Sequence, residues 1–361
     1  MTIRKALIAK VDMGARGIQP ACSEKCGQNV RVPGKAGGFA ITSIVCVLLL
    51  ILAFAARLTA AAEKLPEAVN LYEKGSFRQA VEILRQETKA SPRDAEIRLW
   101  LGKAYLKVQD WKAAVAELEK AVEIEPANAL YRQWLGRASG ERASRAFVTT
   151  AYSMAKQVVR EFETASRLAP QNLSIRFDLL EYYLQAPGML GGGKDKAEAE
   201  ARTIAEIDRQ KGYTARANIY KKDKQWDKAE TELLQAAYEF PESAAACEDL
   251  ADYLSGRQNH EGALLWSRKA LALNPQLKFS RFLTAAAATR LNRDLEAAAD
   301  ELQALANGPL SDDDPTFEQI YYQLGENYLA RGDKAKAKAA FQSALSYNPE
   351  HSRAKEALKK L

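Results

Sequence analysis

The feature that most constrains this chain is a group of apolar residues that recurs every 34 positions. Each copy has an aromatic residue, then an alanine, a leucine and a proline at fixed offsets. Three copies are Phe77, Ala80, Leu84 and Pro92; Trp111, Ala114, Leu118 and Pro126; and Trp226, Ala229, Leu233 and Pro241. Spacings of three and four residues place the apolar positions on one face of a helix. Proline ends that helix, because it lacks an amide hydrogen. The pattern therefore predicts a row of repeated helical units rather than independent domains.

The composition supports an all-α fold. The chain has 361 residues, of which 47% are hydrophobic and 27% are charged. Alanine, leucine, glutamate, lysine and arginine are abundant, and these are strong helix formers. No long stretch alternates Val, Ile or Thr with polar residues, as a half-buried strand would. We therefore expect helices and no sheet.

The last copy resembles the tetratricopeptide repeat. It contains Leu324, Gly325, Tyr328, Gly332, Ala337, Phe341, Ala344 and Pro349 in the order of that family's 34-residue pattern. The resemblance implies a right-handed α-solenoid of about eight helix pairs over residues 63–361, preceded by one hydrophobic N-terminal helix. Small residues such as Gly102, Gly136 and Ala114 are then expected where neighbouring helices approach closely.

The predicted units cover 61–94, 95–128, 129–172, 173–209, 210–243, 244–277, 278–315 and 318–351, and Ser352–Leu361 forms a closing helix. Three units are irregular. The third is about ten residues longer than the others, and we expect a lengthened helix and turn over Ala138–Met154. The fourth carries an insertion, Ala186–Gly193, which we expect to be a flexible loop. The seventh ends in a polar break, Asn307–Pro315.

The N-terminal part predicts membrane targeting. Residues 1–38 form a basic tail with a net charge of +5, whereas residues 63–361 contain 44 basic and 44 acidic side chains. The nineteen residues from Gly38 to Ala56 carry no formal charge, and as a helix they would span about 28 Å, close to the thickness of the hydrocarbon core. We expect residues 39–62 to form a transmembrane anchor or a signal peptide, with membrane contact through residues 39–56.

The location of the solenoid follows from the charge pattern. The positive-inside rule keeps the basic tail in the cytoplasm and sends the repeats across the membrane. Two outcomes remain open: a single-pass protein of a bacterial inner membrane, or a protein released after cleavage at a small-residue run such as 60–62. The stretch from Ala186 to Ala197 also resembles a segment found in exported bacterial repeat proteins.

Several kinds of chemistry lack a matching constellation. The repeats carry no net charge, whereas a nucleic-acid-binding domain concentrates positive charge. The sequence therefore does not indicate nucleic-acid binding. Only two histidines occur, His260 and His351, each at an expected turn, so neither a zinc site nor a triad is indicated. Gly188 to Lys194 matches part of a phosphate-binding loop, but Asp195 replaces the Ser/Thr and a helix precedes it. The acidic run at 312–314 is interpreted as a solvated loop. We expect no cofactor, no metal, no small-molecule substrate and no catalysis.

The remaining function is binding of a protein or peptide partner. In tetratricopeptide arrays the first helix of each unit lines an inner groove, and the resemblance implies such a role for a set of residues here. The candidates are Leu99, Lys103, Leu106, Lys107, Arg137, Phe177, Glu181, Asn218 and Lys222. Their cationic members favour an acidic segment. The alternatives are a permanent structural or assembly subunit of an envelope complex and, with less support, an enzyme whose site lies in the insertions.

Overall fold

The computed structural model describes residues 64–146 and 148–361. The chain divides into two compact units, Met1–Ala55 and Ala56–Leu361, and every described residue belongs to the second. Helical residues 64–73 come first. The elements that follow are α2 (Phe77–Ala90), α3 (Ala95–Lys107), α4 (Trp111–Ile124), α5 (Ala129–Ala143), α6 (Val148–Leu168), α7 (Leu173–Gln185), the 3₁₀ turn η1 (Gly188–Leu190), α8 (Lys194–Ile207), α9 (Arg209–Lys222), α10 (Trp226–Glu239), α11 (Ala244–Gly256), α12 (His260–Leu273), α13 (Lys278–Arg290), α14 (Leu295–Asn307), α15 (Phe317–Ala330), α16 (Lys334–Tyr347) and α17 (Ser352–Lys360).

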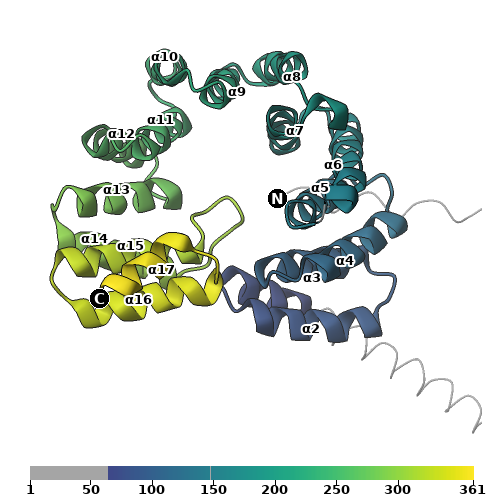
Figure 1. The fold of residues 1–361 in the computed structure, drawn as a ribbon, viewed down its shortest axis with the longest axis horizontal. Coiled ribbons are helices and arrows are strands. Elements are labelled where there is room, and N and C mark those ends of the chain that lie inside the picture. The colour runs from purple at the N-terminus through teal and green to yellow at the C-terminus, as the bar shows by residue number, and fades with distance from the viewer. Residues whose placement is uncertain (1–63, 147) are drawn as a thin grey trace, which may run out of the picture. The chain divides into compact units, whose positions relative to one another are not determined.

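The helices stack in chain order as consecutive pairs (Figure 1). The described residues contain eight pairs and a final helix, and the pairs follow the predicted units, except that α9 and α15 each begin one residue before the predicted start. No strand occurs among these residues. The all-α prediction and the predicted solenoid of helix pairs are therefore confirmed for the described part of the chain.

The pairs are joined by turns with a recurring backbone conformation. A residue with positive φ stands between the two helices of most units: Gly75, Gln109, Lys224, Gln258, Asn292 and Gly332. After it, an Asp or Asn often caps the second helix, as Asp110 does by accepting a hydrogen bond from the amide of Ala113 at 3.0 Å. The side-chain oxygen satisfies an amide that has no partner within the helix. Local turn chemistry therefore sets each helix boundary in the same register.

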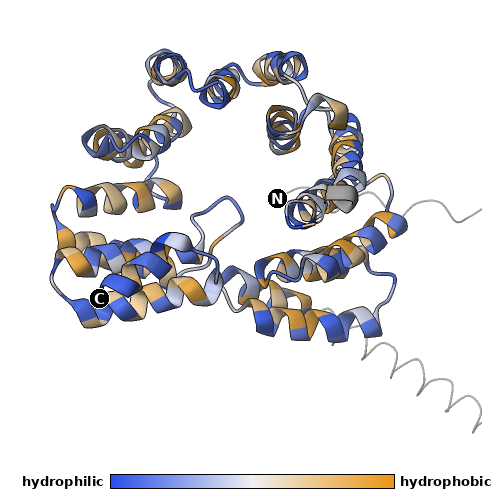
Figure 2. Ribbon diagram, in the orientation of Figure 1, coloured by the Kyte–Doolittle hydropathy of each residue, from blue (hydrophilic) through white to orange (hydrophobic). Residues whose placement is uncertain are grey.

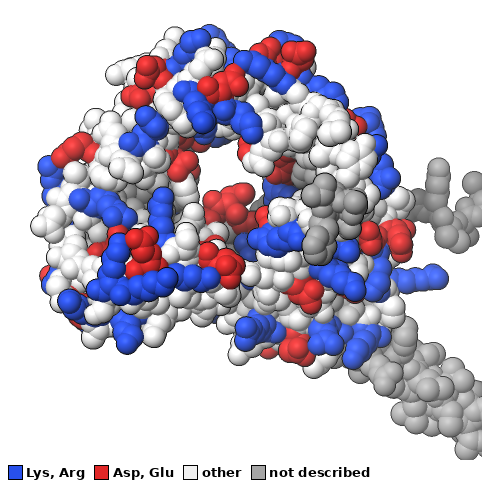
Figure 3. Space-filling model, in the orientation of Figure 1, with Lys and Arg blue, Asp and Glu red and all other residues white. Residues whose placement is uncertain are grey.

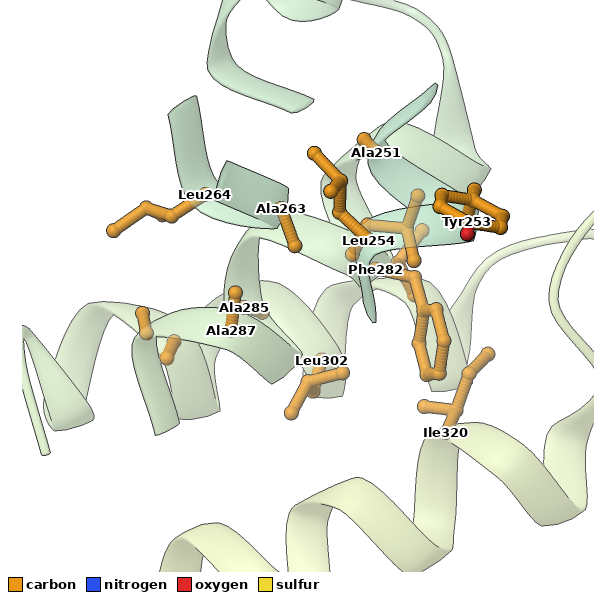
Figure 4. Packing of buried hydrophobic residues seen from close by; sticks show 14 of the residues in the cluster. Ala251, Tyr253, Leu254, Ala263, Leu264, Phe282, Ala285, Ala287, Leu302 and Ile320 are labelled. Carbon is orange, nitrogen blue, oxygen red and sulfur yellow. The ribbon is translucent and has the colours of Figure 1, made fainter. Parts of the chain in front are cut away.

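Small residues allow the paired helices to pack closely. A Cβ added at Gly102 would lie 2.5 Å from the Leu118 side chain, and one at Gly325 would lie 2.4 Å from the ring of Phe341. Ala80, Ala114 and Ala229 have no exposed surface. The apolar side of the helices faces their neighbours (Figure 2). The largest cluster of buried apolar side chains extends from α9 through α16 and includes Phe282, Leu302 and Ile320 (Figure 4). The cores form between successive helices, as expected of repeats that cannot bury their apolar faces alone.

The first unit of this array meets the seventh and eighth units. The segment that links α14 to α15, residues 308–316, is termed here the closing segment. Its Leu310 amide donates to the carbonyl of Glu73 at 2.7 Å. Beside it, the ring of Phe77 contacts the rings of Phe317 and Tyr347, each at a centroid distance of 6.1 Å. The array therefore closes on itself, and an opening remains at its centre (Figure 3).

The two irregular middle units differ in part from the predictions. In the third unit the extra length lies in α6, which has 21 residues, whereas Ala138–Met154 spans the end of α5, a turn and the start of α6. In the fourth unit the Ala186–Gly193 insertion is fixed by several hydrogen bonds rather than free. The Tyr182 hydroxyl lies 2.7 Å from the Leu190 carbonyl oxygen, and the Lys196 ammonium donates to the Gly191 carbonyl at 2.9 Å.

The predicted membrane segment, residues 38–56, lies outside the described residues, as do the basic tail and the boundary at residue 62. Among the helices that the structure describes, none combines the length and the apolarity needed to cross a bilayer.

Candidate functional site

The main pocket lies on the inner side of the first units, next to the closing segment. It has a volume of about 1160 Å³ and is lined by parts of α3, α5, α6, α7, η1 and residues 310–318. Aromatic side chains form much of its wall: Tyr72, Phe77, Trp111, Trp134, Tyr152, Phe162, Tyr182, Phe317 and Tyr347. Charged groups are set between these rings. A pocket with apolar walls and a few placed charges is the usual form of a binding site.

Asp312 of the closing segment reaches the inner surface of the first two units. Its Oδ2 atom lies 2.7 Å from the ammonium of Lys103, and its Oδ1 atom lies 3.5 Å from that of Lys107. The hydroxyl of Tyr72 donates to Oδ1 at 2.6 Å. One carboxylate therefore receives three partners from two neighbouring helix pairs, across 240 residues of sequence in the case of Tyr72.

Lys103 is enclosed by aromatic rings. Its ammonium lies 3.8 Å from the ring centroid of Trp100, 4.8 Å from that of Trp134 and 5.2 Å from that of Tyr72. The residue is only 7% exposed. Ring faces attract a cation, but they replace only part of its lost hydration. A counter-anion is therefore required at this position, and Asp312 supplies it.

The ionisation of the cluster follows from burial and from these contacts. Burial raises the pKa of Asp312, but the charge and hydrogen bond of Lys103, the Tyr72 hydroxyl and the Lys107 charge outweigh burial, so the pKa lies below its ordinary 3.8. Burial lowers the pKa of Lys103, and its attraction to Asp312 opposes that shift. Burial and the neighbouring Asp312 charge hold the pKa of Tyr72 well above its ordinary value, so the phenol stays a donor.

Arg137 forms a second polar group on the same wall. Its Nε atom donates to Asp178 at 2.7 Å, and its guanidinium carbon lies 4.9 Å from the ring centroid of Trp134. Gln133 donates to the same Asp178 oxygen, also at 2.7 Å. These contacts join α5 to α7 and hold the guanidinium in place beside the pocket.

The structure separates the predicted groove residues into three groups. Leu106, Lys107, Arg137 and Glu181 line the pocket, and Lys103 lies beside it. Their role in partner binding stays a prediction.

Two other candidates do not line this pocket. Leu99 is 5% exposed and packs with residues of α4 and α5 in the core. Phe177 is half-buried and packs against the cluster formed by α6 to α9. Asn218 and Lys222 lie on α9 and do not line the pocket. Asn218 and Lys222 have the same repeat positions as Lys103 and Lys107, but their unit lies in another part of the array.

The sequence interpretation missed the closing segment. Residues 312–314 do not form a simple solvated run: Asp312 is bound by Lys103, and Asp314 accepts from Lys278 at 2.9 Å, whereas Asp313 is exposed. The adjoining Leu310 is buried, being 5% exposed. That apolar residue inside a polar break was the signal available in the sequence.

Other candidate chemistry finds no support in the described residues. No group of three or more His, Cys, Asp or Glu side chains there has metal-binding geometry. His260 begins α12, and the Nδ1 atom of His351 accepts from the amide of Ala354 at 3.1 Å, capping α17. Lys194, the lysine of the partial phosphate-loop pattern, pairs with Asp223 at 2.5 Å.

Comparison with known families supports the repeat assignment. Tetratricopeptide-repeat models match residues 71–137 and residues 318–351. Proteins with tetratricopeptide repeats generally mediate protein–protein interactions, and this all-helical fold is typically a non-enzymatic scaffold. A search of curated proteins found no match.

Several solved structures align with this chain at low sequence identity. Yeast Tom70 aligns with a TM-score of 0.53 and 18% identity, over 80% of this chain and 58% of that one. Human IFIT1, solved as a dimer with a capped RNA fragment, gives 0.47 and 16%, over 81% and 70% of the two chains. A tetratricopeptide repeat protein from Parabacteroides merdae gives 0.41 and 14%, over 83% and 98%. This chain thus spans less than two thirds of the yeast protein's length.

Proposed function

We propose that this chain is a non-catalytic scaffold of the bacterial cell envelope that binds a segment of a partner protein in its inner pocket. The observation that carries the proposal is the pocket itself. Its walls combine several aromatic rings with fixed cationic groups, and such walls suit apolar anchors flanked by acidic residues. The closing segment already contacts one end of this surface through the Asp312 carboxylate, which pairs with Lys103 and Lys107.

The pocket proposal is tested by photo-crosslinking from defined positions in intact cells. Met189 lines the pocket and is 75% exposed, so a photo-reactive amino acid there reaches a bound partner without disturbing the core. We expect a discrete crosslinked partner from this position. Leu106→Glu, a charge placed in the pocket wall, should then lower its yield at least tenfold. Equal yields with and without this substitution would rule the pocket out as the binding site.

A second candidate function is a permanent assembly subunit. The observation that favours it is an exposed apolar patch on α10 and α12, where Tyr238 is 71% exposed, Leu265 is 66% exposed and Trp266 contacts the Tyr238 ring edge-on at 6.1 Å. Exposed apolar surface of this kind marks contact sites. An assembly subunit would purify in a stable complex that Leu265→Glu disrupts and Leu106→Glu leaves intact. A pocket binder would show the opposite response.

The envelope location is part of the proposal. It rests on the uncharged stretch 38–56 and on the basic tail before it. Protease added outside the inner membrane should cleave the repeats but spare residues 1–38. Protection of the repeats until the membrane is disrupted would overturn this topology. The mass of the mature chain separates a retained anchor from a cleaved signal.

A further inference from the structure

The closing segment contacts the first units through only a few groups. On the side of the first two pairs these are the Leu310 amide on Glu73 and the Asp312 carboxylate on Tyr72, Lys103 and Lys107. On its own side the segment is tied to α13, because Lys278 donates to the Pro309 carbonyl at 2.7 Å and to Asp314 at 2.9 Å. The segment is therefore anchored at one side and docked at the other.

The docked groups are those of a short extended peptide. They comprise one backbone amide and, two residues later, one carboxylate. Neither is particular to this chain, so a partner segment with an acidic residue offers the same contacts. We propose that the closing segment is an internal ligand, and that an extended partner peptide carrying an acidic residue competes with it for Tyr72, Lys103 and Lys107. This inference rests on the proposed function and specifies the partner's chemistry.

The environment of Lys103 explains why the competitor must be acidic. When Asp312 leaves, the Lys103 ammonium remains among three aromatic rings without its carboxylate and with Lys107 nearby. Two neighbouring cations without a counter-anion repel each other. A neutral peptide would leave the Lys103 charge unpaired, whereas a carboxylate on the peptide restores the ion pair. The empty site therefore selects an anion, and the pocket beside it takes the rest of the peptide.

Tethering favours the internal ligand. A segment held on the same folded array docks at an effective concentration of about millimolar or more. A free peptide with the same groups binds the intact chain weakly and binds a chain whose own carboxylate is missing more strongly. This difference can be measured.

The probe is a synthetic peptide with the sequence of residues 307–316 and a photo-reactive phenylalanine in place of Leu310. It is irradiated with the full-length chain in detergent, and the labelled residues are mapped by mass spectrometry. Three chains are compared: the unchanged chain, Asp312→Ala and the matched control Asp313→Ala. Asp313 belongs to the same acidic run, is exposed, and makes no ion pair with the described residues. We expect at least tenfold more labelling of residues 64–107 in Asp312→Ala than in the other two chains.

Two further measurements make the result decisive. A second peptide with alanine at the position of Asp312 should lose this labelling. Hydrogen exchange should show that Asp312→Ala releases residues 308–317 while α9 to α12 keep their protection. Equal labelling in the three chains, labelling indifferent to the peptide's aspartate, or unchanged exchange of residues 308–317 would each overturn the internal-ligand proposal. Equal pocket crosslinking with and without Leu106→Glu would overturn the proposed function alone, so the two failures are distinguishable.

Discussion

Alanine substitution at two glycines of α5 should have opposite effects on stability. Gly136 and Gly140 lie one turn apart on the same helix. A Cβ at Gly136 would lie 2.5 Å from the Phe162 ring, whereas a Cβ at Gly140 meets nothing within 4 Å. Phe162 is 6% exposed and packed between helices, so it cannot move aside freely.

The magnitudes follow from two opposing contributions. Replacing glycine by alanine within a helix stabilises it by about 1 kcal/mol, because alanine loses less backbone entropy. Overpacking a core by one methyl group costs about 1–3 kcal/mol. Gly140→Ala gains only the first contribution and should be about 1 kcal/mol more stable. Gly136→Ala carries both, and we expect a net loss of about 0–2 kcal/mol.

The assay is urea unfolding followed by circular dichroism at 222 nm, in detergent that keeps residues 38–56 in solution. The two variants should move the transition that includes α5 in opposite directions from the unchanged chain. If Gly136→Ala proves as stable as Gly140→Ala, the close approach of α5 to α6 is not what requires glycine at position 136.

Four further predictions concern the cluster at Asp312 and the turns. Lys103→Met should destabilise the chain by about 1–3 kcal/mol, because it leaves Asp312 with fewer partners. Adding Asp312→Asn should recover part of that loss, which a double-mutant cycle of urea unfolding measures. The pKa of Asp312 is lowered from 3.8 in the folded state, so its contribution to stability is fully present above pH 3.8 and is lost as the pH falls through the folded pKa. The difference in urea midpoint between the unchanged chain and Asp312→Asn should therefore shrink below about pH 4, and a constant difference would contradict this. Tyr182→Phe should speed hydrogen exchange at residues 189–193, since its hydroxyl contacts the Leu190 carbonyl, with no change in α11. Gln258→Gly should raise the free energy of unfolding by about 1 kcal/mol, because φ there is +63°; a lower free energy of unfolding would exclude backbone strain at this turn.

The sequence was sufficient to predict the helix pairs because the relevant information is local. A cap such as Asp110, a proline such as Pro126 and a small residue such as Gly102 each act within one unit or on the next. The same information placed Lys103 and Lys107 on the inner side. It could not supply their partner, since Asp312 lies more than 200 residues away and its neighbours resemble an ordinary solvated loop.

The location of the pocket depends on how successive helix pairs are rotated relative to one another, which cannot be deduced from a single repeat. Each pair adds a small rotation, and the sum of these rotations decides which units face each other. Asn218 and Lys222 share repeat positions with pocket residues, but the accumulated rotation places α9 away from the pocket. Equivalent positions in a repeat are therefore not equivalent positions in the assembled array.

Closure of the array also changes how the protein comes apart. In an open row of repeats the terminal units fray first, because each contacts one neighbour only. Here the contact of Tyr72 with Asp312 joins units separated by 240 residues. Forming it from the unfolded chain would cost about 5 kcal/mol of loop-closure entropy, so we expect closure to follow the folding of the helix pairs. Once closed, the first unit cannot open without releasing the closing segment, so the first and seventh units share a single opening free energy.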